Sequence, residues 1–388
     1  MAAAPRTPLA EKELKGLKYF QLLTPFLDRL HDDATARDQA GNRRLFYDQY
    51  VCLLLLYFFN PTVKSLRGIQ QASDLDKVQR LFGCRRVSRG ALSEASRVFD
   101  PELLHSIIGD LAAQALPVVH GKEAEALRGL TAVDGSLLPA LPKMAWALWL
   151  DPQHRAAKMH VQFDVLKGVP IGTTVTTGNG SETEQLRATL QPHRLYVMDR
   201  GYADYQLFQD IVDAKSHLIG RIRDNAVWTV VEERPLSPAA LAAGVRSDRV
   251  VWLGGPHSGR PLQQSLRVLE VATGQPDTQG RPEILRLATS RLDLDAELVA
   301  LAYRFRWAVE LFFRWLKCIL GCQHLLALSQ QGVTIQVYLA MIASLLITLW
   351  AGRKPSVRTL EMIQFYFQGW ASEAELRAHF DRLPPPKQ

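Results

Sequence analysis

Residues 303–317 read YRFRWAVELFFRWLK, a mostly apolar segment that polar groups interrupt at a fixed spacing. On a helix that turns by about 100° per residue, Tyr303, Arg306, Glu310 and Lys317 share an arc of roughly 60°, and Arg314 lies beside it. The spacing predicts one amphipathic helix, which buries its apolar face against another layer and keeps one acid and several cations on the other face. A solvated stripe with an Arg306–Glu310 ion pair is the simpler alternative. That alternative does not explain why Tyr303 lies on the polar face or why this face extends as far as Lys317.

Two earlier apolar runs each end at an aspartate. LTAVDGSLL contains Asp134 and HRLYVMDRGY contains Asp199, and each run indicates a short buried strand. Carboxylates at strand ends can converge above a sheet, where they repel each other unless a cation lies between them. Mg²⁺ suits that position because it prefers oxygen ligands. Glu310 is the natural third carboxylate, so these three residues are the predicted catalytic groups and metal ligands. Asp164 and Asp204 remain second choices.

Changes in the local pattern divide the chain into parts. Residues 1–120 are predicted to form a helical region. Residues 121–350 alternate between strand and helix patterns, which predicts an α/β core. Within them, residues 217–290 are predicted to be a β-rich insertion, and residues 351–388 are predicted to be a helical tail with a candidate dimer contact. The predicted N-terminal helices cover residues 44–59, 62–73, 75–82, 88–98 and 101–116.

The charge distribution favours a polyanionic partner. The net charge is +7, and in residues 1–100 there are 16 Lys and Arg against 11 Asp and Glu. Six basic residues lie between Lys77 and Arg97, with one acid among them. Short helices that end in a basic helix, here with Arg89 and Arg97, are typical of a helix-turn-helix that enters the major groove. The alternative is a solvated basic face on a helical bundle.

These features together resemble the DDE transposases of bacterial insertion sequences. The four polar residues of segment 303–317 match the YREK signature of one group of that family. AVDGSLL around Asp134 and MDRGYADY around Asp199 resemble its first two catalytic segments, and KMHVQFDVLKGVPIGTTVTTGN resembles the hairpin and loop between them. The order of two aspartates, a long β-rich stretch and a glutamate is also that of the family. The similarity spans about residues 125–350.

The resemblance implies an RNase H-like catalytic core, interrupted by a β-rich insertion domain and preceded by an all-helical DNA-binding region. It implies that the three carboxylates hold two Mg²⁺ ions, with Mn²⁺ as an alternative. Water and then the freed 3′-hydroxyl would attack the DNA backbone. Arg306, Lys317 and Tyr303 would hold the transposon end, and relatives often form a hairpin with a flipped base stacked on an aromatic residue. Further candidates for DNA contact are Arg200, Tyr202, Arg314, Trp228 and Trp252, with simple packing as the alternative for either tryptophan.

The predicted partners are double-stranded DNA, as transposon ends and as target, and a second copy of the chain, since two ends must be held together. Residues 335–352 approach the length of a membrane span, but Gln336, Ser344 and Thr348 interrupt them, which favours a buried core helix. We therefore expect no membrane contact and a cytoplasmic, nucleoid-associated location. Two alternatives remain open: a catalytically inactive DNA-binding repressor of transposition, and a plain metal-dependent nuclease.

Overall fold

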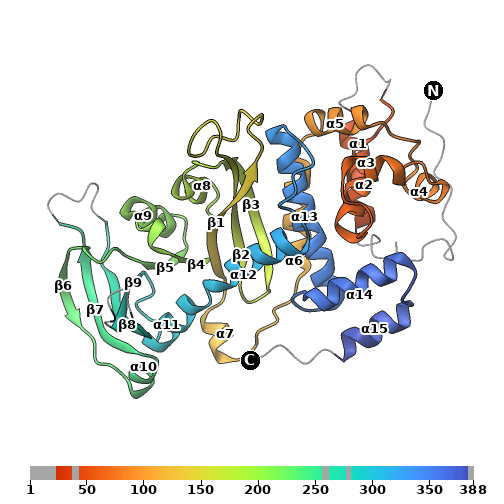
Figure 1. The fold of residues 1–388 in the computed structure, drawn as a ribbon. Coiled ribbons are helices and arrows are strands. Elements are labelled where there is room, and N and C mark those ends of the chain that lie inside the picture. The colour runs from red at the N-terminus through yellow and green to blue at the C-terminus, as the bar shows by residue number, and fades with distance from the viewer. Residues whose placement is uncertain (1–22, 37–42, 256–261, 277–279, 281, 383–388) are drawn as a thin grey trace.

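The computed structural model describes residues 23–36, 43–255, 262–276, 280 and 282–382. Within these residues one nine-stranded sheet has the order β3-β2-β1-β4-β5-β9-β8-β7-β6 (Figure 1). The strands are β1 (Leu130–Ala140), β2 (Arg155–Asp164), β3 (Val169–Thr177), β4 (Leu195–Met198), β5 (His217–Arg221), β6 (Trp228–Glu233), β7 (Val245–Leu253), β8 (Leu266–Pro276) and β9 (Pro282–Thr289).

The strand directions are mixed, and the sheet with its helices agrees with the predicted α/β class. β1 to β3 pair antiparallel, whereas β4 pairs parallel with β1 and β5 parallel with β4. This order and mixture are consistent with an RNase H-like core. β5, the first strand in the range predicted as an insertion, belongs to this part of the sheet. β9 then pairs antiparallel with β5, so the remaining strands continue the same sheet.

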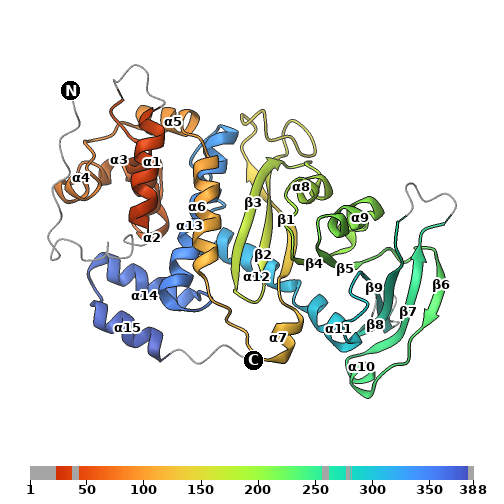
Figure 2. The ribbon, with the colours of Figure 1, turned by 180° about the vertical axis from the view of Figure 1, so that it is seen from behind.

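Helices cover both faces of β1. On one face, Val133 packs in a cluster with residues of α8 (Glu182–Ala188) and α9 (Tyr205–Asp213). On the other face, Ala132 packs in the main core with α12 (Trp307–Arg314) and α13 (Gln330–Ala351). Successive side chains of a strand point to opposite faces, so β1 is sandwiched between the two sets of helices. Figures 1 and 2 show α12 crossing the sheet.

The N-terminal helices share the main core with α13. α13 contacts α2, α5 and α6, and β3 lies beside α6 and α13 (Figure 2). Each of the five predicted N-terminal helices matches an observed helix within a few residues, and the Ser88 side chain caps α5. The helices are α1 (Thr24–Ala36), α2 (Tyr47–Phe59), α3 (Leu66–Ala72), α4 (Asp76–Phe82), α5 (Arg89–Val98), α6 (Glu102–Gln114) and α7 (Lys122–Ala126).

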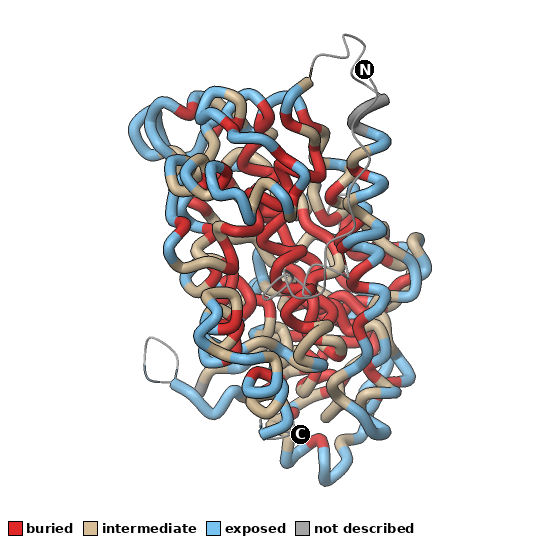
Figure 3. The backbone as a smooth tube through the Cα atoms, turned by 90° about the vertical axis from the view of Figure 1, so that its right-hand side faces the viewer, coloured by how far each residue is buried: buried red, intermediate tan, exposed pale blue. Residues whose placement is uncertain are grey.

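α13 has the length and apolar composition of a membrane span, but 94% of its most apolar window is buried inside the protein. This burial supports the prediction of a core helix, and Figure 3 shows the buried segments gathered along the centre of the molecule. The remaining helices are α10 (Pro238–Ala242), α11 (Ala296–Arg304), α14 (Val357–Gln368) and α15 (Glu373–Asp381). The outer ends of the predicted helical region and tail, residues 1–22 and 383–388, lie outside the described residues.

Segment 303–317 is not one regular helix, and that prediction is wrong. α11 ends at Arg304, residues 305 and 306 form a turn, and α12 begins at Trp307. A π-helical turn, Trp315–Ile319, then follows α12. The turn and the wider π turn change the direction of the side chains, so an arc drawn at a constant 100° per residue does not describe this segment.

Candidate active site

Asp134 and Asp199 lie at the same edge of the core sheet. Asp199 directly follows β4, as predicted. Asp134 does not end its strand, because antiparallel pairing with β2 carries β1 on to Ala140. The parallel pairing of β1 with β4 stops at Ala132, however, so both aspartates lie just beyond the shared part of β1 and β4. Each carboxylate is held by a backbone N–H: Gly135 donates to Asp134 at 2.8 Å and Gly201 to Asp199 at 2.7 Å.

The turn before α12 brings a guanidinium to these acids. Arg306 Nη2 lies 2.6 Å from Glu310 Oε1, and Arg306 Nη1 lies 3.9 Å from Asp134 Oδ2. The three side chains are only 15%, 29% and 19% exposed, in that order. Arg306 therefore links a carboxylate of β1 to a carboxylate of α12 in a largely desolvated place, where charge-assisted hydrogen bonds are strong.

The pKa of Asp134 is raised to about 7, chiefly by burial and also by the negative charges of Asp199 and Glu182. The Gly135 hydrogen bond and Arg306 act in the opposite direction. Desolvation and repulsion between carboxylates both disfavour the ionised form. A cation beside Asp134 would therefore stabilise its ionised form.

Tyr303 and Lys317 also lie at this site. Burial raises the pKa of Tyr303, which also feels the charges of Arg306 and Asp199. Lys317 Nζ donates to Ser136 Oγ at 3.0 Å and to the Leu137 carbonyl at 3.5 Å, so it reaches β1 beside Asp134, and it forms no ion pair with a carboxylate of the described residues. The π turn brings Lys317 to this position.

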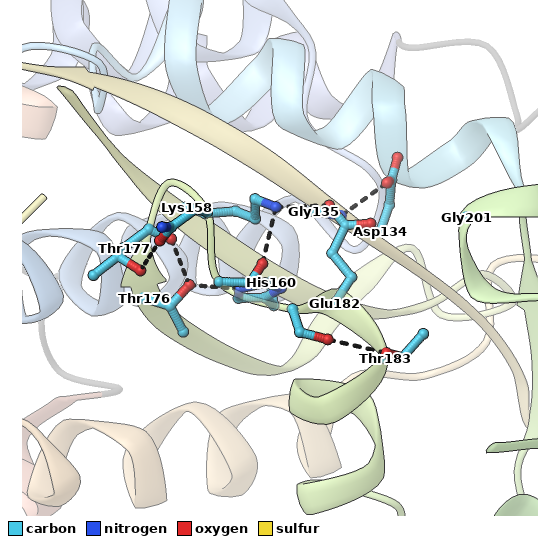
Figure 4. A network of polar contacts seen from close by, with 12 residues as sticks. Asp134, Gly135, Lys158, His160, Thr176, Thr177, Glu182, Thr183 and Gly201 are labelled. Carbon is cyan, nitrogen blue, oxygen red and sulfur yellow. Dashed lines mark hydrogen bonds and ion pairs between the residues drawn. The ribbon is translucent and has the colours of Figure 1, made fainter. Parts of the chain in front are cut away.

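Glu182 is a carboxylate at this site that the sequence reasoning missed. It lies in the first turn of α8, and its side chain extends over Gly135 between β1 and the segment of Gly201 (Figure 4). A Cβ at residue 135 would come within 2.9 Å of Glu182 Cδ and closer still to Oε1. The glycine after Asp134 was a signal, since close approach of another group is one reason to require glycine.

Lys158 holds Glu182 in place. Its ammonium lies 3.3 Å from Glu182 Oε1 and donates to the Gly180 carbonyl at 3.0 Å (Figure 4). Lys158 projects from β2, a strand that was predicted for its pattern and not for its chemistry. This ion pair partly neutralises Glu182, which lies close to Asp134. Lys158 and Glu182 are distant in the sequence, so no local pattern predicts their contact.

A cleft of about 630 Å³ opens beside Asp199 and is lined by Arg200 and the loop between β5 and β6. Arg200 pairs with Asp224 at 3.3 Å on the surface, and both side chains are more than half exposed. Tyr202 was predicted to contact DNA, but its side chain is only 2% exposed and packs in the cluster under α8 and α9. The structure therefore contradicts a DNA contact by Tyr202, because the ring faces the core and not the cleft.

The structure does not bring every candidate to this site. Trp228 begins β6 with Arg286 over its ring at 5.3 Å, and Trp252 lies on β7; these two strands lie at the far end of the sheet from β3. Exposed Arg89 and Arg97 are on α5, outside the core sheet. Trp307, which directly follows Arg306, is 55% exposed and was not among the candidates. Arg314 is exposed on α12.

The two second-choice carboxylates have structural partners instead. Asp164 lies 3.1 Å from Arg194 and accepts the Lys167 N–H at the turn after β2. Asp204 caps α9 by accepting the Leu207 N–H at 3.0 Å.

In this arrangement, no group of three or more His, Cys, Asp and Glu residues in the described part of the chain could hold a metal ion. The donors still fit a hard divalent cation, because they are carboxylate oxygens and Asp134 and Asp199 are close enough to repel each other. What separates Glu310 from this pair is Arg306, whose guanidinium lies between Asp134 and Glu310.

The raised pKa of Asp134 predicts how the stability of the metal-free protein depends on pH. A folded-state pKa of about 7, against the ordinary 3.8 of an exposed aspartate, means that this group favours the folded state most below pH 4. That contribution is lost as the pH rises to 7. Asp134→Asn imitates the neutral group, so variant and wild type should be similarly stable near pH 4, whereas at pH 8 the variant should be more stable by up to about 4 kcal/mol.

Thermal unfolding in a chelating buffer between pH 4 and 8 measures this difference. A gap between the two midpoints that widens with pH supports the raised pKa. Two curves that stay parallel across the range would rule it out.

Comparison with known proteins agrees with this geometry. Residues 125–346 match the family model for the transposase DDE domain, which is more than half of the 388 residues. A putative transposase of Sinorhizobium fredii is 28% identical over 266 residues, covering 66% of this chain and 70% of that protein. A probable transposase for insertion sequence element IS5377 of Geobacillus stearothermophilus is 23% identical over 302 residues, covering 76% and 74%.

A putative transposase for insertion sequence element IS4SA of Synechocystis is 22% identical over 301 residues, covering 76% of this chain and 81% of that protein. A cryo-EM structure of a piggyBac transposase synaptic complex with hairpin DNA aligns with a TM-score of 0.43 and 12% identity, covering 99% and 89% of the two chains. With the family model matched over its catalytic region, the chain belongs to the family of transposases with a DDE domain.

Proposed function

We propose that this transposase belongs to the YREK group, binds the inverted-repeat ends of its insertion sequence, cuts them by metal-dependent phosphodiester hydrolysis and joins the 3′-hydroxyl ends to target DNA. A hairpin on the transposon end is part of the proposal. The observation that carries it is the meeting of Asp134, Asp199, Arg306 and Glu310, which come from three separate stretches of the chain. Phosphoryl transfer needs this combination, since its catalysis consists mainly of positioning and charge stabilisation.

In the proposal, Asp134, Asp199 and Glu310 hold two Mg²⁺ ions, and Mn²⁺ can replace them. When bound, the two ions activate the attacking oxygen and stabilise the leaving oxygen. The chain's own residues keep the carboxylates in place: the backbone of Gly135 and Gly201 fixes the two aspartates.

The cations of the site hold the DNA end in this proposal. Arg306 binds a phosphate of the transposon strand with its planar fork, and Lys317 binds a neighbouring phosphate as a point charge. Tyr303 contacts the same strand. Arg200 and Arg223 line the cleft beside Asp199 and supply positive charge for the flanking backbone.

Other parts of the chain have supporting roles. The helical region of residues 1–120 binds the inverted repeats, with exposed Arg89 and Arg97 on α5 among its contacts. Arg314, Trp228 and Trp252 remain proposed DNA contacts. Residues 351–388 contribute to a homodimer, a proposal that rests on exposed Phe365 and Trp370, whose rings stack at 5.8 Å. The proposed location is the cytoplasm, at the nucleoid.

Strand transfer tests the proposal directly. Precut DNA ends carrying the inverted repeat, incubated with this protein, a plasmid and Mg²⁺, should yield joined products. A chelator should abolish them. In parallel reactions on uncut ends, cutting without later joining would identify a plain nuclease, whereas specific binding without cutting would identify a repressor, and either result would overturn the proposal.

A further inference from the structure

Arg306 has two partners that are themselves proposed metal ligands. Its guanidinium lies 2.6 Å from Glu310 and 3.9 Å from Asp134, and its side chain is 15% exposed. An ion pair between residues four apart on a solvated helix face contributes little. This one differs because it also reaches a carboxylate of another element and is largely removed from water.

The guanidinium takes the place of a cation among these carboxylates. Glu310 is drawn to Arg306 and, in this arrangement, no three acidic or other metal-binding side chains of the described residues form a group that could hold an ion. Removing one partner of a largely buried ion pair is unfavourable, because it leaves a charge uncompensated. Arg306 therefore leaves its carboxylates at low cost only when another cation replaces it and another anion receives it.

A DNA phosphate and a divalent cation provide that exchange together. The phosphate receives Arg306, and the cation receives Asp134 and Glu310. Once the phosphate has bound Arg306, the carboxylates are available to the cation, and once the cation has bound the carboxylates, Arg306 is available to the phosphate. Each ligand therefore lowers the free-energy cost of binding the other, which is positive coupling. The side chain of Arg306 departs from the turn between α11 and α12, so it can be redirected without breaking the interior of a helix.

We infer that Arg306 is the internal counter-ion of the proposed metal site and that capture of a DNA phosphate by Arg306 assembles the metal ligands. The inference rests on the proposed function and adds its regulation: metal and DNA end bind cooperatively, so the site is assembled only on DNA. Lys317 does not take part in this coupling, because its partners are the neutral Ser136 hydroxyl and the Leu137 carbonyl.

Binding of Mn²⁺ to the full chain, followed by the electron paramagnetic resonance signal of the free ion, tests the inference without any catalysis. A duplex with the inverted repeat should tighten Mn²⁺ binding to wild type by about 5-fold or more, and Mn²⁺ should tighten DNA binding by the same factor. Arg306→Gln should bind Mn²⁺ more tightly than wild type without DNA, by about 5-fold or more, and saturating DNA should add no further gain.

Lys317→Gln is the matched control. It removes another proposed phosphate contact and should weaken DNA binding. It should leave the Mn²⁺ affinity of the free protein unchanged, and saturating DNA should still tighten Mn²⁺ binding. Arg306→Lys keeps the positive charge, so its Mn²⁺ affinity without DNA should stay near that of wild type, which guards against misfolding of the glutamine variant.

The outcomes separate this inference from the proposed function. If Mn²⁺ binds and Glu310→Gln weakens its binding, but Arg306→Gln binds Mn²⁺ no better than wild type without DNA, Arg306 is only a DNA contact and the inference fails alone. If wild type binds no Mn²⁺ even with DNA, the proposed metal site and the inference fail together.

Discussion

Asp134→Asn, Asp199→Asn and Glu310→Gln should each abolish cleavage at the element's ends while binding of those ends persists. Each change keeps the shape of the side chain and removes a negative charge that the proposed metal site needs. Losing a metal's contribution of about 4 kcal/mol to transition-state stabilisation corresponds to a rate loss of roughly a thousand-fold. Denaturing gels of end-labelled DNA measure the cleavage, and mobility shifts measure the binding.

Asp204→Asn is the matched control for these variants. Asp204 lies five residues after Asp199 and accepts the Leu207 N–H as the cap of α9. Asparagine caps helices about as well as aspartate, so this variant should keep full cleavage. Retained cleavage in any of the three site variants would remove that residue from the proposed ligand set, and retained cleavage in all three would end the enzymatic proposal.

Much of the fold follows from local patterns in the sequence. The helices around Ser88 and the turn at Gly168, whose φ is 69°, were predictable because caps and left-handed turns act within a few residues. The length of β1 was not predictable in this way. Asp134 looked like the end of a strand, yet pairing with β2 continues β1 beyond it. That pairing depends on residues of β2 that lie 15 to 25 positions away in the chain.

The candidate site was predictable where charge and spacing coincide. The spacing of Arg306, Glu310 and Lys317 identified them as candidates. The single regular helix assumed for that spacing is interrupted by a turn and a π turn. Glu182 was missed because its approach to Gly135 joins segments that no local pattern connects. Tyr202 was misjudged because proximity to Asp199 in sequence does not show which way the ring points, and the ring is buried.

A buried ion pair in the strand-rich part of the sheet is also hydrogen-bonded to the segment before α11. Arg267 of β8 donates from Nε to Asp248 of β7 at 2.7 Å and from Nη2 at 2.5 Å. The two residues are 2% and 3% exposed. Arg267 Nη1 also donates to the carbonyl of Leu294, which directly precedes the cap of α11. Because α11 leads to Tyr303 and Arg306, this arginine connects the outer strands to the proposed site.

Arg267→Met should destabilise the protein by about 3–5 kcal/mol, because it leaves Asp248 buried without its partner. This loss is a large part of the 5–15 kcal/mol that typically holds a domain folded. The midpoint of thermal unfolding in metal-free buffer measures it.

Arg267→Met combined with Asp248→Leu should recover most of the lost stability, since two apolar side chains in place of a buried ion pair are often neutral. About 1 kcal/mol should remain lost, because the Leu294 carbonyl keeps no donor in either variant. Recovery in the double variant would show that the unpaired carboxylate causes the damage. If the double variant is instead as unstable as the single one, the lost contact with Leu294 dominates, and Arg267 then matters chiefly as the link to α11.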